Sequence, residues 1–170
     1  MKILVMSDSH GNKDNMLDAI SAEAPELILH LGDNIKDCEV INLSYPDIPL
    51  RTVKGNCDIG YSGLEMDEFK YGGKRFFMTH GHLYGVKTNI RRIVEAAIYR
   101  DVDVLLFGHT HIPYHSAIEG LMAVNPGSIG DNLKSYAILE IENKTISCEL
   151  KRVLNVHNYL GGKNNGIWRC

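Results

Sequence analysis

The first two thirds of the chain alternate between short apolar runs and segments with a helical apolar stripe. Five runs have the length and composition of buried strands: KILVM, ELILHL, LRTV, KRFFM and VDVLLF. A helix is predicted after the first run, because Leu17, Ile20 and Ala24 share one helical face. A second helix is predicted over residues 87–100, where one stripe contains Ile90, Ile93, Val94, Ala97 and Ile98.

The last third of the chain has a different pattern. The segments YHSAIEG, LMAVNPGS, SYAILEIE and TISCELKRV predict short strands, separated by turn signals at Glu119-Gly120 and Asn143-Lys144. Apolar and polar residues alternate from Ile146 to Leu150, as in a half-exposed antiparallel strand. Strand-helix units followed by hairpins predict an α/β sandwich that contains a mixed sheet.

Composition limits the class of protein. A chain of 170 residues suits one domain, and a hydrophobic fraction of 44% is enough for a sizeable core. The net charge of −3 creates no strong field toward nucleic acid or an anionic membrane, and no apolar run has the length of a membrane span. We therefore expect no membrane partner and no specific nucleic-acid site.

The four cysteines are scattered and form no C-x-x-C pair, which disfavours a zinc ribbon or a redox motif. Reduced thiols in a cytoplasmic protein are the simplest interpretation. The end of the chain, NYLGGKNNGIWRC, is rich in glycine and asparagine. We expect a single domain over residues 1–153 and a C-terminal tail over residues 154–170.

Each of the five strand-like runs in the first two thirds ends at a glycine-containing loop with Asp, Asn or His. In open α/β sheets, ligands gather at the carboxyl ends of the strands, so these loops are expected to meet. Glycine beside each polar residue allows tight turns and close backbone approach. The loop residues are Asp8, His10, Asp33, Asn56, His80, His82, His109 and His111.

Two imidazoles flank a single threonine in the segment GHTH. His109 and His111 cannot share a buried loop unless something satisfies their ring nitrogens, and a cation does so. A mixture of carboxylate, amide and imidazole suits divalent Mn, Fe, Ni or Zn. It does not suit calcium, which prefers cages made entirely of oxygen.

The motifs DSH, GDN, GNCD, THGH and GHTH occur in this order at the strand ends. Together they resemble the calcineurin-like metallophosphoesterase family, and the length and the segment NPGS are similar to its small bacterial and archaeal phosphodiesterase branch. The resemblance covers residues 1–153. It implies a four-layer α-β-β-α sandwich with two mixed β-sheets, and a metal-dependent phosphodiesterase.

The resemblance also implies roles for individual residues. Asp8, His10 and His111 would hold one metal ion, and Asn56, His80 and His109 would hold a second. Asp33 would bridge the two ions, and Asp33 and Asn56 would count among the catalytic residues. The expected cofactor is a pair of divalent ions, Mn first, with Ni, Fe or Zn as alternatives.

The implied reaction is in-line attack on phosphorus by a hydroxide bound to the dinuclear centre. Only two of the seven implied ligands, Asp8 and Asp33, are carboxylates, so the centre stays cationic with the hydroxide included. This charge favours binding of a phosphate ester and gives weak support for diesters over monoesters. A short chain with few insertions indicates a small or flexible phosphodiester substrate.

One position departs from the family pattern. Many members have histidine where this chain has Cys57, and that histidine is thought to assist the leaving group. A thiol with a pKa of about 8.5 replaces an imidazolium poorly, which disfavours monoesters. Asp58 would orient the missing histidine or act structurally. His82 would contact phosphate or a metal ligand, and Asn12 would reach substrate or cap a helix.

Simpler roles exist for several residues. Asp8 and Asp33 could be helix N-caps, and Asn56 could be a turn residue. His30 lies inside an apolar strand and is interpreted as a hydrogen-bonded core histidine. Residues interpreted as turn-forming or solvent-exposed are Lys87, Arg91, Arg92, His115, Asn125, Ser128 and His157.

Three alternatives to a phosphodiesterase stay open. The same site could serve a phosphomonoesterase or a nucleotide pyrophosphatase. A non-catalytic scaffold of the same fold is the third, and it is disfavoured because all seven implied ligand positions hold competent ligands. Substrate selectivity is expected in loops over residues 61–70 and around Tyr84, and exposed strand edges are compatible with a homodimer.

Overall fold

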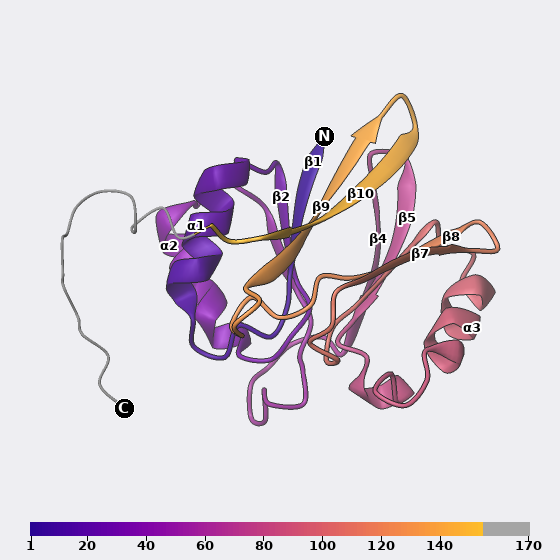
Figure 1. Ribbon diagram of the computed structural model, residues 1–170, viewed down its shortest axis with the longest axis horizontal. Coiled ribbons are helices and arrows are strands. Elements are labelled where there is room, and N and C mark those ends of the chain that lie inside the picture. The colour runs from indigo at the N-terminus through magenta and orange to yellow at the C-terminus, as the bar shows by residue number, and fades with distance from the viewer. Residues whose placement is uncertain (155–170) are drawn as a thin grey trace, which may run out of the picture.

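Two five-stranded sheets, β10-β9-β1-β2-β3 and β4-β5-β6-β8-β7, pack face to face in the computed structural model, which describes residues 1–154 (Figure 1). The first sheet consists of β1 (Lys2–Met6), β2 (Leu27–His30), β3 (Leu50–Thr52), β9 (Ser135–Glu142) and β10 (Thr145–Arg152). The second consists of β4 (Met66–Tyr71), β5 (Lys74–Thr79), β6 (Val104–Phe107), β7 (Tyr114–Ile118) and β8 (Leu121–Asn125). Each sheet combines parallel and antiparallel pairs, as predicted.

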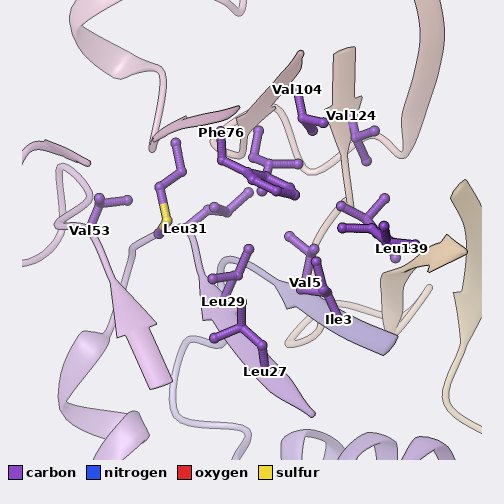
Figure 2. Packing of buried hydrophobic residues seen from close by; sticks show 14 residues of the cluster. Ile3, Val5, Leu27, Leu29, Leu31, Val53, Phe76, Val104, Val124 and Leu139 are labelled. Atoms are coloured by element: carbon purple, nitrogen blue, oxygen red, sulfur yellow. The ribbon is translucent and has the colours of Figure 1, made fainter. Parts of the chain in front are cut away.

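The main core lies between the two sheets (Figure 2). Ile3, Val5 and Leu29 of the first sheet pack in one cluster with Phe76 and Val104 of the second. Alternate strand residues point to the other face, where each sheet packs against helices. The two sheets and their helix layers therefore form the α-β-β-α sandwich that the family resemblance implied.

The helices cover the outer faces. Against the first sheet pack α1 (Lys13–Glu23) and α2 (Glu39–Ser44), and against the second packs α3 (Arg91–Tyr99). Two short 3-10 helices, η1 (Ile35–Cys38) and η2 (His82–Tyr84), complete the described elements. None of the helices within residues 1–154 has the length and apolar character needed to cross a membrane.

The predicted apolar face of α1 is partly wrong. The helix ends at Glu23, and Ala24 follows it as an exposed cap residue in the left-handed conformation. The buried face consists of Asn15, Met16, Ala19, Ile20 and Glu23, because polar partners inside the protein satisfy its two polar members. In α3 the residues of the predicted apolar stripe are buried at Ile93, Val94 and Ala97, but Ile98 is exposed.

The prediction of a loop over residues 61–70 is correct for residues 61–65 and wrong for residues 66–70. Met66–Tyr71 forms β4, an edge strand that pairs antiparallel with β5. The predicted turns are confirmed, since Glu119, Asn143 and Lys144 have positive φ between adjacent strands. The predicted tail over residues 154–170 lies outside the described residues except for Leu154.

The parallel strands determine where the polar loops meet. β1, β2 and β3 run parallel in the first sheet, and β5, β6 and β8 run parallel in the second. The segments after β1, β2, β3, β5 and β6 carry the polar residues singled out above, and hydrogen bonds join these segments. The amide of Asp8 donates to Gly32 O, and the amide of Gly108 donates to His80 O.

Candidate metal centre

Three buried polar side chains form the floor of the site. Asp8 follows β1, Asp33 follows β2, and His80 follows β5, so both sheets contribute. The Nε2 atom of His80 lies 3.5 Å from Asp33 Oδ1 and 3.9 Å from Asp8 Oδ1. Two carboxylates withdrawn from water beside the same imidazole need cationic compensation.

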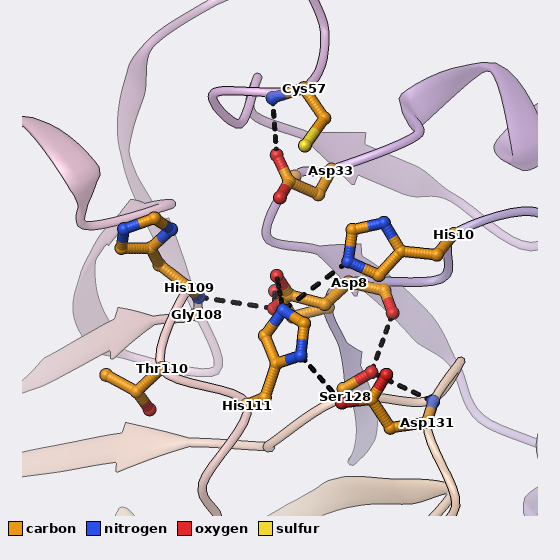
Figure 3. A network of polar contacts seen from close by, with 12 residues as sticks. Asp8, His10, Asp33, Cys57, Gly108, His109, Thr110, His111, Ser128 and Asp131 are labelled. Atoms are coloured by element: carbon orange, nitrogen blue, oxygen red, sulfur yellow. Dashed lines mark hydrogen bonds and ion pairs between the residues drawn. The ribbon is translucent and has the colours of Figure 1, made fainter. Parts of the chain in front are cut away.

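A first cluster of metal-binding atoms forms around Asp8. Side-chain donor atoms of Asp8, His10 and His111 all lie within 4.8 Å of one another. His111 Nε2 is 3.0 Å from Asp8 Oδ1 and 3.4 Å from His10 Nε2 (Figure 3). Asp8 Oδ1 is buried and accepts no hydrogen bond, whereas Oδ2 accepts one from Ser7 Oγ. An unpartnered buried carboxylate oxygen at this place fits a metal ligand.

A second cluster forms around His80. Donor atoms of Asp33, His80 and His109 lie within 4.8 Å of one another. His80 Nε2 lies 3.1 Å from His109 Nδ1 and 3.2 Å from Asn56 Oδ1. Asp33 also forms a third group with His10 and Cys57. Asp33 therefore lies between the two clusters, and all seven residues expected as ligands come together.

Hydrogen bonds on the far side of two imidazoles fix their tautomers. His80 Nδ1 lies 2.8 Å from the carbonyl oxygen of Leu31, and His111 Nδ1 lies 2.6 Å from Asp131 Oδ2. Because both partners can only accept, Nδ1 carries the hydrogen in each ring. The lone pair of each Nε2 then faces the cluster, as a metal ligand requires.

Backbone strain is concentrated in the same residues. Five of the seven have positive φ, a conformation uncommon for residues with a side chain and enriched at functional sites. These are Asp8, His10, Asp33, His109 and His111, with φ from 45° to 67°. The surrounding contacts therefore hold these side chains in place against the local preference of the backbone.

Glycine is required where loops approach the carboxylates. A Cβ on Gly55 would overlap the side chain of Asp33, and a Cβ on Gly108 would overlap Ser7 Oγ. The same atom on Gly108 would lie 3.0 Å from Asp8 Oδ2. The close backbone approach predicted for glycines beside the ligands is confirmed at both positions.

Two buried aspartates position the ligand loops. Asp58 Oδ2 accepts hydrogen bonds from the amides of Asp33 at 2.9 Å and Gly55 at 2.8 Å. Asp37 Oδ2 accepts from Ser9 Oγ at 2.8 Å and from the amide of Gly11 at 2.7 Å. Asp58 thus has a structural role here, and Asp37 was not singled out in the sequence because its partners lie in another loop.

The segment after β8 does more than shape a turn. Asn125 Nδ2 donates to Gly108 O at 2.8 Å, and Ser128 Oγ donates to Asp8 O at 2.8 Å. Ser128 Oγ also accepts from the amide of Asp131 at 3.1 Å. These bonds join the loop that carries Asp8 to the loop that follows β6.

Electrostatic effects differ between the two carboxylates. Burial raises the pKa of Asp8 above its ordinary value, and the nearby imidazoles oppose this only in part. Burial would also raise the pKa of Asp33, but the neighbouring His80 and the hydrogen bond donated by the Cys57 amide hold it well below the ordinary value. Burial and the neighbouring His80 lower the pKa of His109 to about 4. A neutral His109 is the form that can bind a metal.

The remaining candidates lie at the edge of the site or serve elsewhere. Asn12 caps α1 by accepting from the amide of Asn15, and it borders the surface hollow beside His10. The His82 ring lies 5.4 Å from that of His80, and its Nδ1 is buried without a hydrogen-bond partner. His30 is buried and accepts from the amide of Gly32, as expected of a core histidine.

The family model for the calcineurin-like phosphoesterase superfamily domain matches residues 1–144. The chain belongs to this superfamily. A probable metallophosphoesterase of Bacillus subtilis, YsnB, is 34% identical over 84% of the chain and 86% of its own length. The Escherichia coli phosphodiesterase YfcE is 26% identical over 82% of the chain and 88% of its own length. Calcineurin-like phosphoesterases use divalent metals, in agreement with the donor atoms gathered here.

Solved structures show the same fold. A predicted phosphoesterase of Streptococcus pneumoniae superposes with a TM-score of 0.74 at 24% identity, over 91% of this chain and 93% of the other. Vps29 of Entamoeba histolytica, determined with Zn²⁺, superposes with a TM-score of 0.70 at 22% identity, over 89% and 98%. At these identities the likeness concerns the fold alone.

Proposed function

We propose that this calcineurin-like phosphoesterase hydrolyses phosphodiesters with two divalent metal ions held on either side of Asp33. The position of Asp33 carries the proposal, because its carboxylate shares one group of donor atoms with His10 and another with His80 and His109. Two ions placed close together repel each other, so a shared anionic ligand between them is needed.

The proposed ligands divide between the two clusters. Asp8, His10 and His111 would hold one ion, and Asn56, His80 and His109 would hold the other. When bound, the ions would supply a nucleophilic hydroxide near neutral pH and stabilise charge on the phosphoryl oxygens. Mn is the proposed metal, with Ni, Fe or Zn as alternatives, since imidazole and carboxylate ligands suit all four.

The site is open to solvent on one side, where a substrate can enter. Asp8, Asp33 and His80 are buried, whereas His10 and Asn56 are exposed at the rim. A phosphate group can therefore approach from solvent while the ligands beneath stay fixed by the surrounding hydrogen bonds. This arrangement favours preorganised binding over closure of a lid.

Cys57 favours diesters over monoesters. It occupies the position where many relatives have histidine, and burial together with the Asp33 carboxylate raises the pKa of its thiol to about 11. The thiol stays neutral at physiological pH and gives a leaving oxygen less electrostatic help than an imidazolium would. Diesters with leaving groups that need little assistance suit such a site, and the phosphodiesterase YfcE supports this preference.

The direct test is hydrolysis of bis(p-nitrophenyl) phosphate by protein stripped of metal with a chelator. Addition of Mn should produce turnover, and His80→Ala should abolish it because His80 lies at the centre of the second cluster. His115→Ala is the matched control, since His115 is exposed on β7. Absence of turnover with Mn, Ni, Fe and Zn alike would contradict the proposal.

A scaffold without catalysis is the second candidate, and the fold shared with Vps29 is the observation that favours it. The same experiment separates the two functions. A scaffold would bind metal, measured by calorimetry, yet hydrolyse neither diesters nor monoesters. The strained and fully assembled ligand set favours the enzyme, because strain of this kind is retained where chemistry requires it.

A further inference from the structure

An apolar groove of about 440 Å³ is lined in part by Thr110 and Ile112, the residues on either side of the proposed ligand His111. Its apolar walls are formed by Val86, Ile90, Phe107, Ile112 and Tyr114. Phe107 is buried, and its ring supports that of the half-buried Tyr114, with centroids 6.1 Å apart and a tilt of 53°. A groove of this size and composition suits a small ligand group with apolar faces.

One loop contributes to both the groove and the candidate metal centre. Thr110 lines the groove and lies between His109 and His111 in the sequence. In Figure 3 the side chain of Thr110 extends away from Asp8, whereas the ring of His111 lies beside it. A ligand whose phosphate sits over the two clusters would therefore have its substituent within reach of the groove.

Ile112 is the most unusual part of the groove. This large apolar side chain is 68% exposed, although it directly follows the proposed ligand His111. Its amide donates to Thr110 Oγ1, which in turn accepts from Asn125 Nδ2, so the loop is fixed. A fixed, exposed apolar side chain beside a polar site is available to a ligand at little ordering cost.

The charge near the groove matches an anionic ester. Lys87 lines the groove, and its side chain is exposed. An exposed cation in the groove attracts a phosphodiester anion that approaches the candidate metal centre. Apolar walls and one cation at the entrance therefore suit an anion with an apolar arm.

We propose that this groove binds an aromatic ester arm of the phosphodiester substrate while the phosphate lies over the two clusters of side-chain donor atoms. The inference rests on the proposed function and adds the class of substrate, an aryl-type diester with a planar apolar group. The planar group would lie against Ile112 and the half-buried Ile90 and Tyr114. Lys87 would lie near the phosphate.

The test compares two monoanionic diester analogues that cannot release an aryl leaving group, methyl phenylphosphonate and methyl methylphosphonate. Calorimetry on the Mn-loaded protein should show the phenyl compound binding roughly tenfold more tightly or better, because only it fills the groove. Ile112→Asn should reduce this ratio to about threefold or less. Ile112→Leu should preserve the preference.

Leu43→Asn is the matched control, since Leu43 is 83% exposed on α2 in the opposite layer. Thermal unfolding of each variant confirms that it is folded. Equal affinity of the wild-type protein for the two analogues would overturn the inference, as would an unchanged ratio in Ile112→Asn. Failure of both analogues to bind, together with absence of diester turnover, would instead refute the proposed function.

Discussion

The carboxylate of Asp131 lies 2.6 Å from Nδ1 of His111, on the opposite side of the ring from Asp8. This contact holds the hydrogen on Nδ1 and directs Nε2 toward the first cluster (Figure 3). The Asp131 amide is itself held by Ser128 Oγ, whose hydroxyl donates to the Asp8 carbonyl. One short chain of hydrogen bonds thus joins two proposed ligands of the same ion.

Removal of the Asp131 carboxylate should weaken metal binding. Asp131→Ala frees the His111 ring, and we expect a roughly 10–100-fold loss of Mn affinity in calorimetry. Asp47→Ala replaces an exposed aspartate outside the site and should leave the affinity unchanged. Wild-type affinity in Asp131→Ala would show that the ring is oriented without this contact.

The close approach at Gly108 predicts a loss of stability. Gly108→Ala places a methyl group against Ser7 and Asp8, and we expect the free energy of unfolding to fall by about 1–3 kcal/mol. Urea unfolding measures this change. Gly63→Ala is the control, because there the new methyl group meets the flexible side chain of Lys54 and lies at an ordinary contact distance from Ile35. Equal stability of the two variants would contradict the proposed overlap.

Glu23 forms a polar cluster distant from the metal centre. It accepts hydrogen bonds from Tyr136 Oη at 2.8 Å and from Lys151 Nζ at 3.0 Å, although its side chain is buried. Burial would raise the pKa of Glu23, but the bonds from Lys151 and Tyr136 outweigh it and lower the pKa below the ordinary value. Ionised Glu23 therefore stabilises the fold.

This stabilisation should depend on pH. At pH 7, Glu23→Gln should lower the free energy of unfolding by about 1–3 kcal/mol. Because the pKa is lower in the folded state, the contribution is complete above the ordinary glutamate pKa of about 4.3 and declines as pH falls through the folded value. Unfolding measured from pH 7 to pH 3 should show the difference between wild type and variant narrowing, in contrast to the exposed control Glu142→Gln. A constant difference would argue against an ionised Glu23.

Restoring the imidazole at position 57 should change the substrate preference. Cys57→His should increase hydrolysis of p-nitrophenyl phosphate relative to the bis ester by about tenfold or more, because an imidazolium assists the leaving oxygen. Cys57→Ser provides no such group and should leave the ratio near that of wild type. If both variants behave alike, the residue at this position does not determine the preference.

The sequence predicts which polar side chains gather at the sheet edge better than it predicts the helices. Asp8, Asp33 and His80 each lie within three residues of the end of a strand, and parallel strands end at one edge of a sheet, so local pattern and topology agree. At α1 the local pattern was misleading. Asn15 and Glu23 occupy buried positions that an apolar stripe assigns to hydrophobic residues, since Ile129 O and Tyr136 satisfy them from distant elements.

Other features that the sequence did not predict also depend on contacts with distant parts of the chain. β4 begins at Met66 and alternates between exposed and half-buried residues, a weak signal at a sheet edge. Asp37 and Asp131 act through partners in loops far away in the sequence, and no local spacing indicates such a pair. The segment GSIGD could have indicated Asp131 as a site residue, because it places a carboxylate in a glycine-containing loop after a strand, as in the other site loops.

The most direct test of the account is a titration of metal-stripped protein with Mn while hydrolysis of bis(p-nitrophenyl) phosphate is followed. We expect turnover to require two equivalents of Mn per chain, and Asp33→Asn to lose it, because the two clusters share Asp33. Full activity at one equivalent, or undiminished activity in Asp33→Asn, would contradict a two-metal centre organised around this carboxylate.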